Sequence, residues 1–326
     1  MRVVFCGRWN RHASAYPETK EFWRVREAVD HGRATAADLR QAADAATRLL
    51  LSQLERLGLD TVSDPGFRWD SLYDIARRIK GCAGFTRLIR IPETNHFHRQ
   101  PVVTLPLRWE GPILGEDLAF ARAHTRVPVA LALPGPYSLA RQTENYREVG
   151  LGRLTEAYAA VLRQEIAALL EAGAAFVKVD DPQVLMHPED APMIRGAAAV
   201  LTKGLDRSRI GLSTWFADVT VFPDYFALPF GLFFLNLIGN GKGIGAVRDL
   251  PADRALALGV VDATQTYAEQ PEDLSERVRP VASQRPAASL MVTSNADFTY
   301  LPWDRALEKL GALVGWARSG QGEGSR

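Results

Sequence analysis

Residues 153–182 read RLTEAYAAVLRQEIAALLEAGAAFVKVDDP. Apolar residues recur at helical spacing from Arg153 to Leu170, and Gly173 is a typical residue at which a helix ends. Phe176–Asp180 is then short and mostly apolar, and an acidic turn that contains a proline follows it, as expected for a strand. A long helix that leads into a short apolar strand is the repeating unit of parallel α/β proteins.

The same unit recurs along the chain. Further strands are predicted at residues 3–6, 59–62, 85–91, 127–133, 210–215, 230–237, 258–261 and 289–292, with an extra strand at 102–107. Helices are predicted at residues 35–57, where Thr35 and Asp38 form a capping box and Gly58 ends the helix, and at 191–205.

At least eight strands that alternate with helices predict an α/β fold of the (β/α)8 TIM-barrel class. An open sheet is disfavoured because no Gly-rich phosphate-binding turn follows an early strand. We predict one barrel domain over residues 1–318, with an N-terminal extension over the barrel mouth. The Gly/Ser-rich residues 319–326 are predicted to form a flexible tail.

Composition excludes several classes of partner. The 326 residues include 39 basic and 38 acidic ones, so the formal net charge is +1 and we expect no nucleic acid and no membrane as partner. Two cysteines, Cys6 and Cys82, argue for a reducing compartment. Early charges and the lack of an apolar run of ~18 residues predict a cytoplasmic protein. Nothing in the sequence specifies an oligomeric state.

Polar residues at the predicted strand ends are the first candidates for a site, because (β/α)8 barrels carry their chemistry there. Asp180 is the foremost catalytic candidate, and Asp181 either contacts substrate or caps a helix. Trp215 either stacks on a substrate or fills the core. Asp64, Asn236 and Asn240 are further candidates for substrate binding. The amides of Asn236 and Asn240 could instead form hydrogen bonds with the backbone.

The segment Asn95-His96-Phe97-His98-Arg99 carries the second group of candidates. Two histidines two residues apart on an extended segment project to one side, where they could shuttle protons or bind a metal with a nearby carboxylate. We predict His96 and His98 as catalytic residues and Asn95 and Arg99 as substrate contacts. The alternative is a polar edge in solvent. Nearby arginines make this stretch basic. The basic side chains form either a binding site for an anion or a surface exposed to solvent.

Several motifs, in their order along the chain, resemble those of the cobalamin-independent methionine synthase family in its short single-barrel form. Residues 176–182 (FVKVDDP) look like the family's Asp-Glu-Pro turn, and residues 133–139 (LPGPYSL) are similar to its Gly-Pro loop. Residues 58–64, 258–274 and 292–303 resemble its early strand, its eighth-strand region and its last strand end. The resemblance implies a barrel of the methionine synthase and uroporphyrinogen decarboxylase type and a methyltransferase with a folate-type methyl donor.

The resemblance also implies a catalytic zinc, but the residues at its ligand positions differ. The family's His-x-Cys is replaced by Ser213-Thr214-Trp215, its ligand Glu by Asn236 and its last Cys by Ala296. Zinc in proteins takes Cys, His or carboxylate ligands, so we expect no zinc at this position. Methyl transfer to a thiol needs a thiolate, and a free thiol with a pKa of about 8.5 is mostly protonated at neutral pH.

The family's contacts to homocysteine are also reduced. Asp180 is present, but Ala15 and Gly66 stand where a Ser and a Glu are expected. The favoured hypothesis is therefore a zinc-free, methionine synthase-like methyltransferase with an altered, small polar substrate. Three alternatives stay open: a metal-free lyase or decarboxylase, an enzyme with a metal relocated to His96 and His98, and a non-catalytic ligand-binding barrel.

Overall fold

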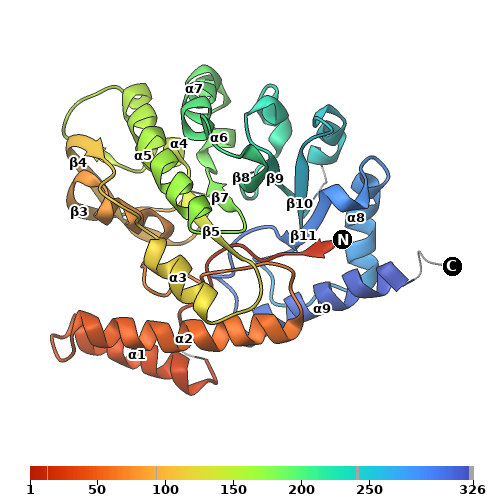
Figure 1. Ribbon diagram of the computed structural model, residues 1–326, viewed down its shortest axis with the longest axis horizontal. Coiled ribbons are helices and arrows are strands. Elements are labelled where there is room, and N and C mark those ends of the chain that lie inside the picture. Colours follow the sequence, from red (N-terminus) through yellow and green to blue (C-terminus); the bar gives the residue numbers. More distant parts are fainter. Residues whose placement is uncertain (13, 93, 240–241, 323–326) are drawn as a thin grey trace.

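The computed structural model describes residues 1–322 except residues 13, 93 and 240–241. Eight parallel strands form its central sheet in the order β1-β11-β10-β9-β8-β7-β5-β2 (Figure 1). Their bounds are β1 (Arg2–Val3), β2 (Val62–Ser63), β5 (Val129–Pro134), β7 (Val177–Asp180), β8 (Ile210–Ser213), β9 (Leu232–Asn236), β10 (Ala255–Val261) and β11 (Leu290–Ser294). The parallel, eight-stranded sheet predicted from the sequence is confirmed.

The sheet closes into a barrel between its edge strands, β1 and β2. Val4 and Thr61 form a parallel bridge. Side chains complete this seam: the Asp60 carboxylate accepts a hydrogen bond from a β1 backbone N–H at 2.7 Å, and the Ser63 hydroxyl accepts one from Gly7 N at 3.0 Å. The eight strands therefore form the predicted (β/α)8 barrel.

Helices surround the barrel, and α1 and α2 lie side by side along its lower edge in Figure 1. The α-helices are α1 (Pro17–Asp30), α2 (Ala36–Leu57), α3 (Gly115–Ala123), α4 (Pro136–Arg141), α5 (Leu151–Glu171), α6 (Gln183–Met186), α7 (Ala191–Thr202), α8 (Pro271–Ala282) and α9 (Trp303–Gly322). Short 3-10 helices are η1 (Leu72–Arg78), η2 (Pro188–Asp190), η3 (Arg207–Arg209), η4 (Val219–Val221), η5 (Tyr225–Ala227), η6 (Lys242–Asp249) and η7 (Ala287–Ser289).

The ends of two helices show how the sequence sets local structure. At the start of α2, Thr35 accepts a hydrogen bond from Asp38 N while the Asp38 side chain accepts one from Thr35 N, and Gly58 ends the helix at a φ of 84°. Both ends were predicted. At the other end of the chain, α9 continues to Gly322, so residues 319–322 of the predicted tail are helical, and residues 323–326 lie outside the described residues.

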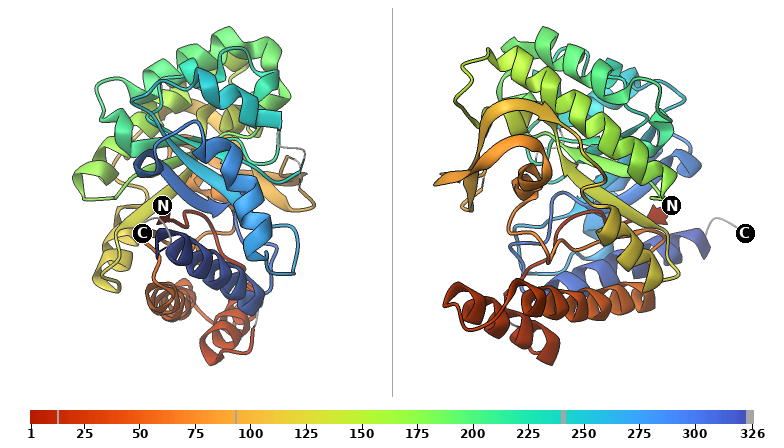
Figure 2. Two further views of the ribbon diagram at one scale, coloured as in Figure 1. Left: turned by 90° about the vertical axis from the view of Figure 1, so that its right-hand side faces the viewer. Right: turned by 60° about the vertical axis from the view of Figure 1, so that its left-hand side comes forward.

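The strand predicted at residues 85–91 does not join the barrel. It is part of β3 (Lys80–Arg90), which pairs antiparallel with β4 (Phe97–Arg108); β4 also pairs with β6 (Glu144–Asn145). This three-stranded sheet stands beside the barrel (Figure 2). The physical reason is the short connection, residues 91–96, because parallel neighbours need a crossover of a dozen or more residues.

The interior of the barrel holds a small apolar cluster with one charged side chain above it. The cluster consists of Val4, Cys6, Ala130, Phe176, Leu232, Phe234, Ala257 and Met291. Strand β7 alternates, so Phe176 and Lys178 face the interior while Val177 and Val179 pack toward the helices. No helix among the described residues is long and apolar enough to cross a membrane.

Candidate functional site

A cavity of about 410 Å³ lies at the carboxyl ends of the barrel strands. Its walls come from six segments. These are the loop after β1 (residues 8–12), α1 (Trp23 and Arg26), residues 70–73 after β2, the β3–β4 connection with Phe97, the loop after β8 (Trp215 and Phe216), and residues 296–300 after β11. Its size is in the range of small-molecule sites, roughly 300–1,000 Å³.

A buried group of three charges lies beneath this cavity, and we call it the cavity floor; of its members, Asp297 lines the cavity. Lys178 Nζ is 3.1 Å from Asp180 Oδ1 and 3.5 Å from Asp297 Oδ1. Asp180 ends β7 and is 0% exposed, whereas Asp297 lines the cavity. The loop after β1 makes room for this carboxylate, because a Cβ on Gly7 would lie 2.3 Å from Asp297 Oδ1.

Burial and mutual pairing set the protonation of this group. Burial opposes the charged form of Lys178, but Asp180 and Asp297 outweigh it, so the pKa of the ammonium is raised. For Asp180, burial raises the pKa to about 6, with Lys178 lowering it and Asp297 raising it. The floor therefore changes charge near pH 6, where Asp180 takes up a proton.

The D180N variant is expected to gain stability relative to the wild type as the pH rises from 5 to 7. The pKa of Asp180 is raised from 3.8 to about 6 in the folded state, so its contribution to stability is complete below pH 3.8 and is lost as the pH rises through 6. The variant does not titrate there. The difference in free energy of unfolding should therefore shift by about 1 kcal/mol in its favour, measured by urea titration at both pH values.

Asp70→Asn is the matched control for this experiment. Burial would raise the pKa of Asp70, but Arg26 and Arg11 outweigh it and hold that pKa at about 2. The carboxylate is ionised at pH 5 and at pH 7, so the effect of D70N should be the same at both. If D180N also behaved identically at both pH values, the proposed uptake of a proton at the cavity floor would be wrong.

Trp215 separates Asp180 from the cavity. Its indole Nε1 donates to Asp180 Oδ1 at 2.9 Å, and the ring lines the cavity. Trp215 has a φ of 57°, a left-handed conformation that costs a non-glycine residue of order 1–3 kcal/mol and concentrates at functional sites. Asn236 supports the same loop by donating to Phe216 O at 3.2 Å, so its amide is used by backbone and does not line the cavity.

His96 and Asn95, two of the predicted site residues, lie in the cavity wall. The His96 ring packs edge-on against Tyr300 with ring centroids 4.2 Å apart. Burial, followed by the nearby His12 and Arg11, lowers the pKa of His96, so its imidazole is neutral at neutral pH. The side chain of Asn95 accepts a hydrogen bond from Arg90 at 3.0 Å.

His98 and Arg99 lie elsewhere. The His98 ring stacks on Tyr73, and its two nitrogens contact Gln142 Oε1 at 2.9 Å and Arg99 O at 3.0 Å. Because both nitrogens are engaged and the ring is buried, His98 does not share a site with His96. Arg99 is exposed on β4 and does not line the cavity. Arg87 and Arg90 of β3 are likewise exposed and outside the lining.

The remaining predicted site residues have structural contacts or fall outside the description. Asp181 accepts hydrogen bonds from Tyr137 N at 3.2 Å and Ser138 N at 2.6 Å, so it caps α4. Capping was the alternative role considered for Asp181. The capped helix, α4, follows β5, the neighbour of β7 in the sheet. Asn240 lies outside the described residues.

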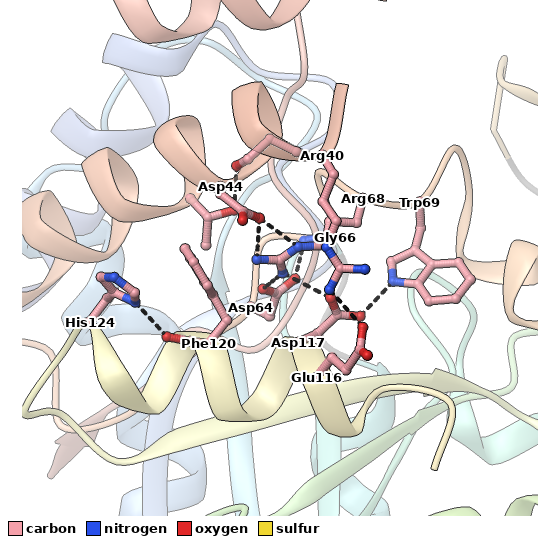
Figure 3. Close-up of polar contacts among 12 residues, drawn as sticks. Arg40, Asp44, Asp64, Gly66, Arg68, Trp69, Glu116, Asp117, Phe120 and His124 are labelled. Atoms are coloured by element: carbon pink, nitrogen blue, oxygen red, sulfur yellow. Dashed lines mark hydrogen bonds and ion pairs between the residues drawn. The ribbon is translucent and has the colours of Figure 1, made fainter. Parts of the chain in front are cut away.

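Asp64 belongs to a charge network on the outer side of the barrel, which we call the Arg68 network (Figure 3). Arg68 donates to Asp44 at 2.6 Å, Asp117 at 2.8 Å and Asp64 at 3.3 Å. Burial, then the Asp117 charge, raises the pKa of Asp64 to about 7, since a single guanidinium cannot neutralise three carboxylates. Asp64 therefore faces the network and not the cavity.

The site also contains charged residues that the sequence interpretation missed. Lys178 and Asp297 form the floor, and Arg8, Arg11 and Arg26 line the wall. One signal was available for Lys178: a lysine in the middle of an apolar strand must be buried and paired. Arg8 and Arg11 lie in a loop, where no periodicity indicates direction, and Arg26 lies on α1.

Comparison with known proteins decides the family. A sequence model described as "Cobalamin-independent synthase, Catalytic domain" matches residues 13–217, more than half of the chain. The chain belongs to the cobalamin-independent synthase family. Methionine synthase of Pyrococcus furiosus is 23% identical over 306 residues, covering 92% of this chain and 89% of the relative. Methionine synthase of Saccharolobus solfataricus is 24% identical, covering 92% and 91%.

Solved structures agree on the fold. A B12-independent methionine synthase from Shewanella sp. W3-18-1, in complex with selenomethionine, superimposes with a TM-score of 0.80 at 18% identity, covering 89% of this chain and 91% of that one. A vitamin-B12 independent methionine synthase from Listeria monocytogenes, described as putative, gives a TM-score of 0.73 at 16% identity, covering 96% and 98%. The (β/α)8 barrel is therefore that of the family.

The residues that the sequence resemblance places at the family's zinc position do not fit that metal. Ser213, Trp215, Asn236 and Ala296 offer no thiolate, imidazole or carboxylate. The indole of Trp215 and the amide of Asn236 are already hydrogen-bonded to the protein. Within the described part of the chain, no group of three or more His, Cys, Asp or Glu side chains is placed to hold a metal ion.

Proposed function

We propose that this chain is a methyltransferase of its family that acts without zinc and on a small polar substrate other than homocysteine. The observation that carries the proposal is Trp215. Its ring lines the cavity and is hydrogen-bonded to Asp180, at the strand end where the resemblance expects a zinc-bound cysteine. An indole there gives the ligand an aromatic surface instead of a metal. The family supports methyl transfer as the reaction class.

The proposed methyl donor is a folate-type compound. The conjugated ring of such a donor can stack on Trp215 or Tyr300, both of which line the cavity. We also propose a cytoplasmic location and no nucleic acid or membrane partner. These two points rest on the composition of the sequence alone.

His96 is the proposed proton acceptor. Without a metal, the acceptor molecule must lose its proton to a side chain, and the neutral His96 imidazole lines the cavity. A ring nitrogen of His96 takes the proton from a thiol, hydroxyl or amine. The freed electron pair forms the bond to the methyl carbon, and the carbon–nitrogen bond of the donor breaks with its electrons left on nitrogen. His96 then returns the proton to that nitrogen.

Asp180 is proposed as a positioning residue. It does not line the cavity but holds the Trp215 ring at 2.9 Å, and Lys178 in turn holds Asp180 at 3.1 Å. His98 is proposed to fix the β3–β4 hairpin, and so the position of His96, through its contact with Gln142. Asn95 and Trp215 keep their proposed roles as substrate contacts, whereas Asp64 and Arg99 have none in this scheme.

A metal-free lyase or decarboxylase is the second candidate. The observation that favours it is the group of guanidinium side chains on the cavity wall, since such groups hold carboxylates and stabilise negative charge. Release of carbon dioxide from a polycarboxylate, with no methyl donor present, would favour this reaction over methyl transfer.

Purified protein is expected to contain far less than one zinc per chain, even after exposure to zinc. Restoring the family's ligands in the variant S213H/W215C/N236E/A296C should raise the zinc content to about one per chain, because it supplies four ligands of the types that zinc prefers. Metal analysis by mass spectrometry after dialysis measures both. The single variant S213H is the control, since one imidazole should not retain the ion.

The same preparations test the reaction. We expect the unmodified protein to transfer a labelled methyl group from a folate-type donor to a small-molecule extract in the presence of a chelator, and H96Q to fail. One tightly held zinc per chain, together with methionine formed from homocysteine, would contradict the proposal. Absence of any labelled product would instead favour a ligand-binding barrel.

A further inference from the structure

Two arginine side chains of the loop after β1 meet at one backbone oxygen. Arg8 Nη2 donates to Trp69 O at 2.6 Å, and Arg11 Nη1 donates to the same atom at 3.0 Å. Both side chains line the cavity. Two like charges this close repel each other, and one carbonyl oxygen does not carry enough negative charge to offset them. An anion placed between the two guanidinium groups would.

Arg8 has no acidic partner of its own. It is 7% exposed, and within the described residues its hydrogen bonds go to the carbonyl oxygens of Trp69 and Gly66, with no carboxylate in ion-pair contact. Burial, followed by the charge of Arg11, lowers the pKa of Arg8 to about 10, so it is still charged at neutral pH. A buried charge is costly unless it is paired.

Asp70, the acid that pairs with Arg11 on this wall, is already engaged. Asp70 pairs with Arg11 at 3.0 Å and with Arg26 at 2.5 Å. Asp70 is also 3.9 Å from Arg77, so this one carboxylate serves three guanidinium groups, and that of Arg8 remains for a ligand. The acids at the cavity floor are shared with Lys178, the closest pair at 3.1 Å.

We propose that Arg8 and Arg11 form a carboxylate-binding subsite, and that the ligand of this cavity carries a carboxylate at one end and an aromatic ring at the other. Guanidinium groups match a carboxylate geometrically through paired N–H donors. In the strand order β1-β11-β10-β9-β8, β8 lies opposite β1 around the ring, so the loop with Trp215 faces the arginine loop across the mouth. One ligand can therefore place its carboxylate against the arginines and its aromatic ring against Trp215. The inference rests on the proposed function, because it concerns the same cavity.

The subsite is held in place before a ligand arrives. The Trp69 indole donates to Asp117 at 2.7 Å, which fixes the residue whose carbonyl orients both arginines (Figure 3). On the other side, the buried Trp9 ring packs on Phe298 with ring centroids 5.4 Å apart and anchors the arginine loop. Side chains fixed in this way lose little entropy on binding, which favours affinity.

The test compares 3-phenylpropionate with its neutral amide, 3-phenylpropionamide, by calorimetric titration. The wild type should bind the acid at least about tenfold more tightly than the amide, because charge-assisted hydrogen bonds are lost with the charge. Arg8→Met should weaken acid binding at least about tenfold and leave amide binding unchanged, and R8K should restore part of it. R99M, which removes an exposed arginine outside the cavity, should bind like the wild type.

The outcomes separate this inference from the proposed function. No binding of the acid, equal binding of acid and amide, or equal binding by the wild type and R8M would overturn the subsite, whatever the result of the methyl-transfer assay. Circular dichroism of R8M and R8K shows whether both are folded, and Arg11→Met provides a second removal if R8M is not. Discrimination for the acid without any methyl transfer would leave the subsite standing and contradict the proposed reaction alone.

Discussion

Lys178→Met is expected to lower the free energy of unfolding by about 3–5 kcal/mol. The substitution keeps most of the buried aliphatic volume but removes the cation that lies 3.1 Å from Asp180 and 3.5 Å from Asp297. Two carboxylates would then face each other in the interior without a counter-charge. Urea unfolding at pH 7 measures the loss, and at pH 5 the loss should be smaller, because Asp180, with its pKa of about 6, is protonated there.

Two further variants separate charge from packing. The triple variant K178M/D180N/D297N removes all three charges and should recover most of the stability, since an uncharged cluster of similar shape needs no counter-ion. Lys80→Met removes an exposed lysine 3.8 Å from Glu110 and should change little. A loss under about 1 kcal/mol for K178M would mean that water or rearrangement neutralises the floor, and would contradict a closely coupled charge group.

Arg68→Met is the second change with a large expected effect, a loss of about 3–5 kcal/mol in the free energy of unfolding. Among the described residues, Arg68 is the one cation in ion-pair contact with Asp44, Asp64 and Asp117. Its guanidinium also lies 4.4 Å from the centre of the Phe120 ring (Figure 3). Its removal leaves three carboxylates together. The loss should be greatest above pH 7, because Asp64 is protonated below its pKa of about 7.

Arg40 provides a matched control within the same network. It pairs with Glu116 at 2.6 Å, but both side chains are at least half exposed, so R40M should cost less than about 1 kcal/mol. R68M should also weaken 3-phenylpropionate binding, because Trp69 next to it orients Arg8 and Arg11. If R68M and R40M were equally stable, the Arg68 network would be a solvated surface feature.

Most of the fold could be predicted because its signals are local. The capping box of Thr35 and Asp38 and the glycine at residue 58 mark α2, and short apolar strands that alternate with helices indicate parallel pairing. The β3–β4 hairpin was assigned differently because a short apolar strand has the same appearance in a barrel and in a side sheet. What distinguishes them is the length of the connection, which at residues 91–96 is too short for a crossover.

The site was predictable only in part, because its side chains come from segments far apart in the sequence. Of the residues predicted to form a site, Asn95, His96 and Trp215 line the cavity. The ion pair of Lys178 with Asp297 joins β7 to the loop after β11, more than a hundred residues away, and no spacing rule connects them. His98 shows the opposite case: its residue type suggested chemistry, but tertiary packing against Tyr73 occupies the ring.

We propose that this chain keeps the barrel of the family while the residues at its centre have been replaced. Homologues share 23–24% of residues across nearly the full length, so the scaffold is retained. At the cavity, Trp215 stands where the resemblance expects a metal ligand, and arginines line the wall where the resemblance expects a serine turn. Under the proposed function, these residues recognise the ligand by charge and aromatic surface in place of a metal.

The barrel seam between β1 and β2 has an evolutionary consequence. Seven of the pairs of neighbouring strands are held by main-chain hydrogen bonds. Every residue type except proline can donate such a bond, so substitutions leave these pairs largely intact. The eighth relies on the Asp60 carboxylate and the Ser63 hydroxyl as well as on the Val4–Thr61 bridge. Main-chain hydrogen bonds also cross this seam, from Asp60 N to Val3 O and from Phe5 N to Thr61 O. A substitution of Asp60 or Ser63 would therefore remove only the side-chain part of a seam that lies at the root of the loop with Arg8. Selection can therefore reset the ligand-facing loop without disturbing the rest of the barrel.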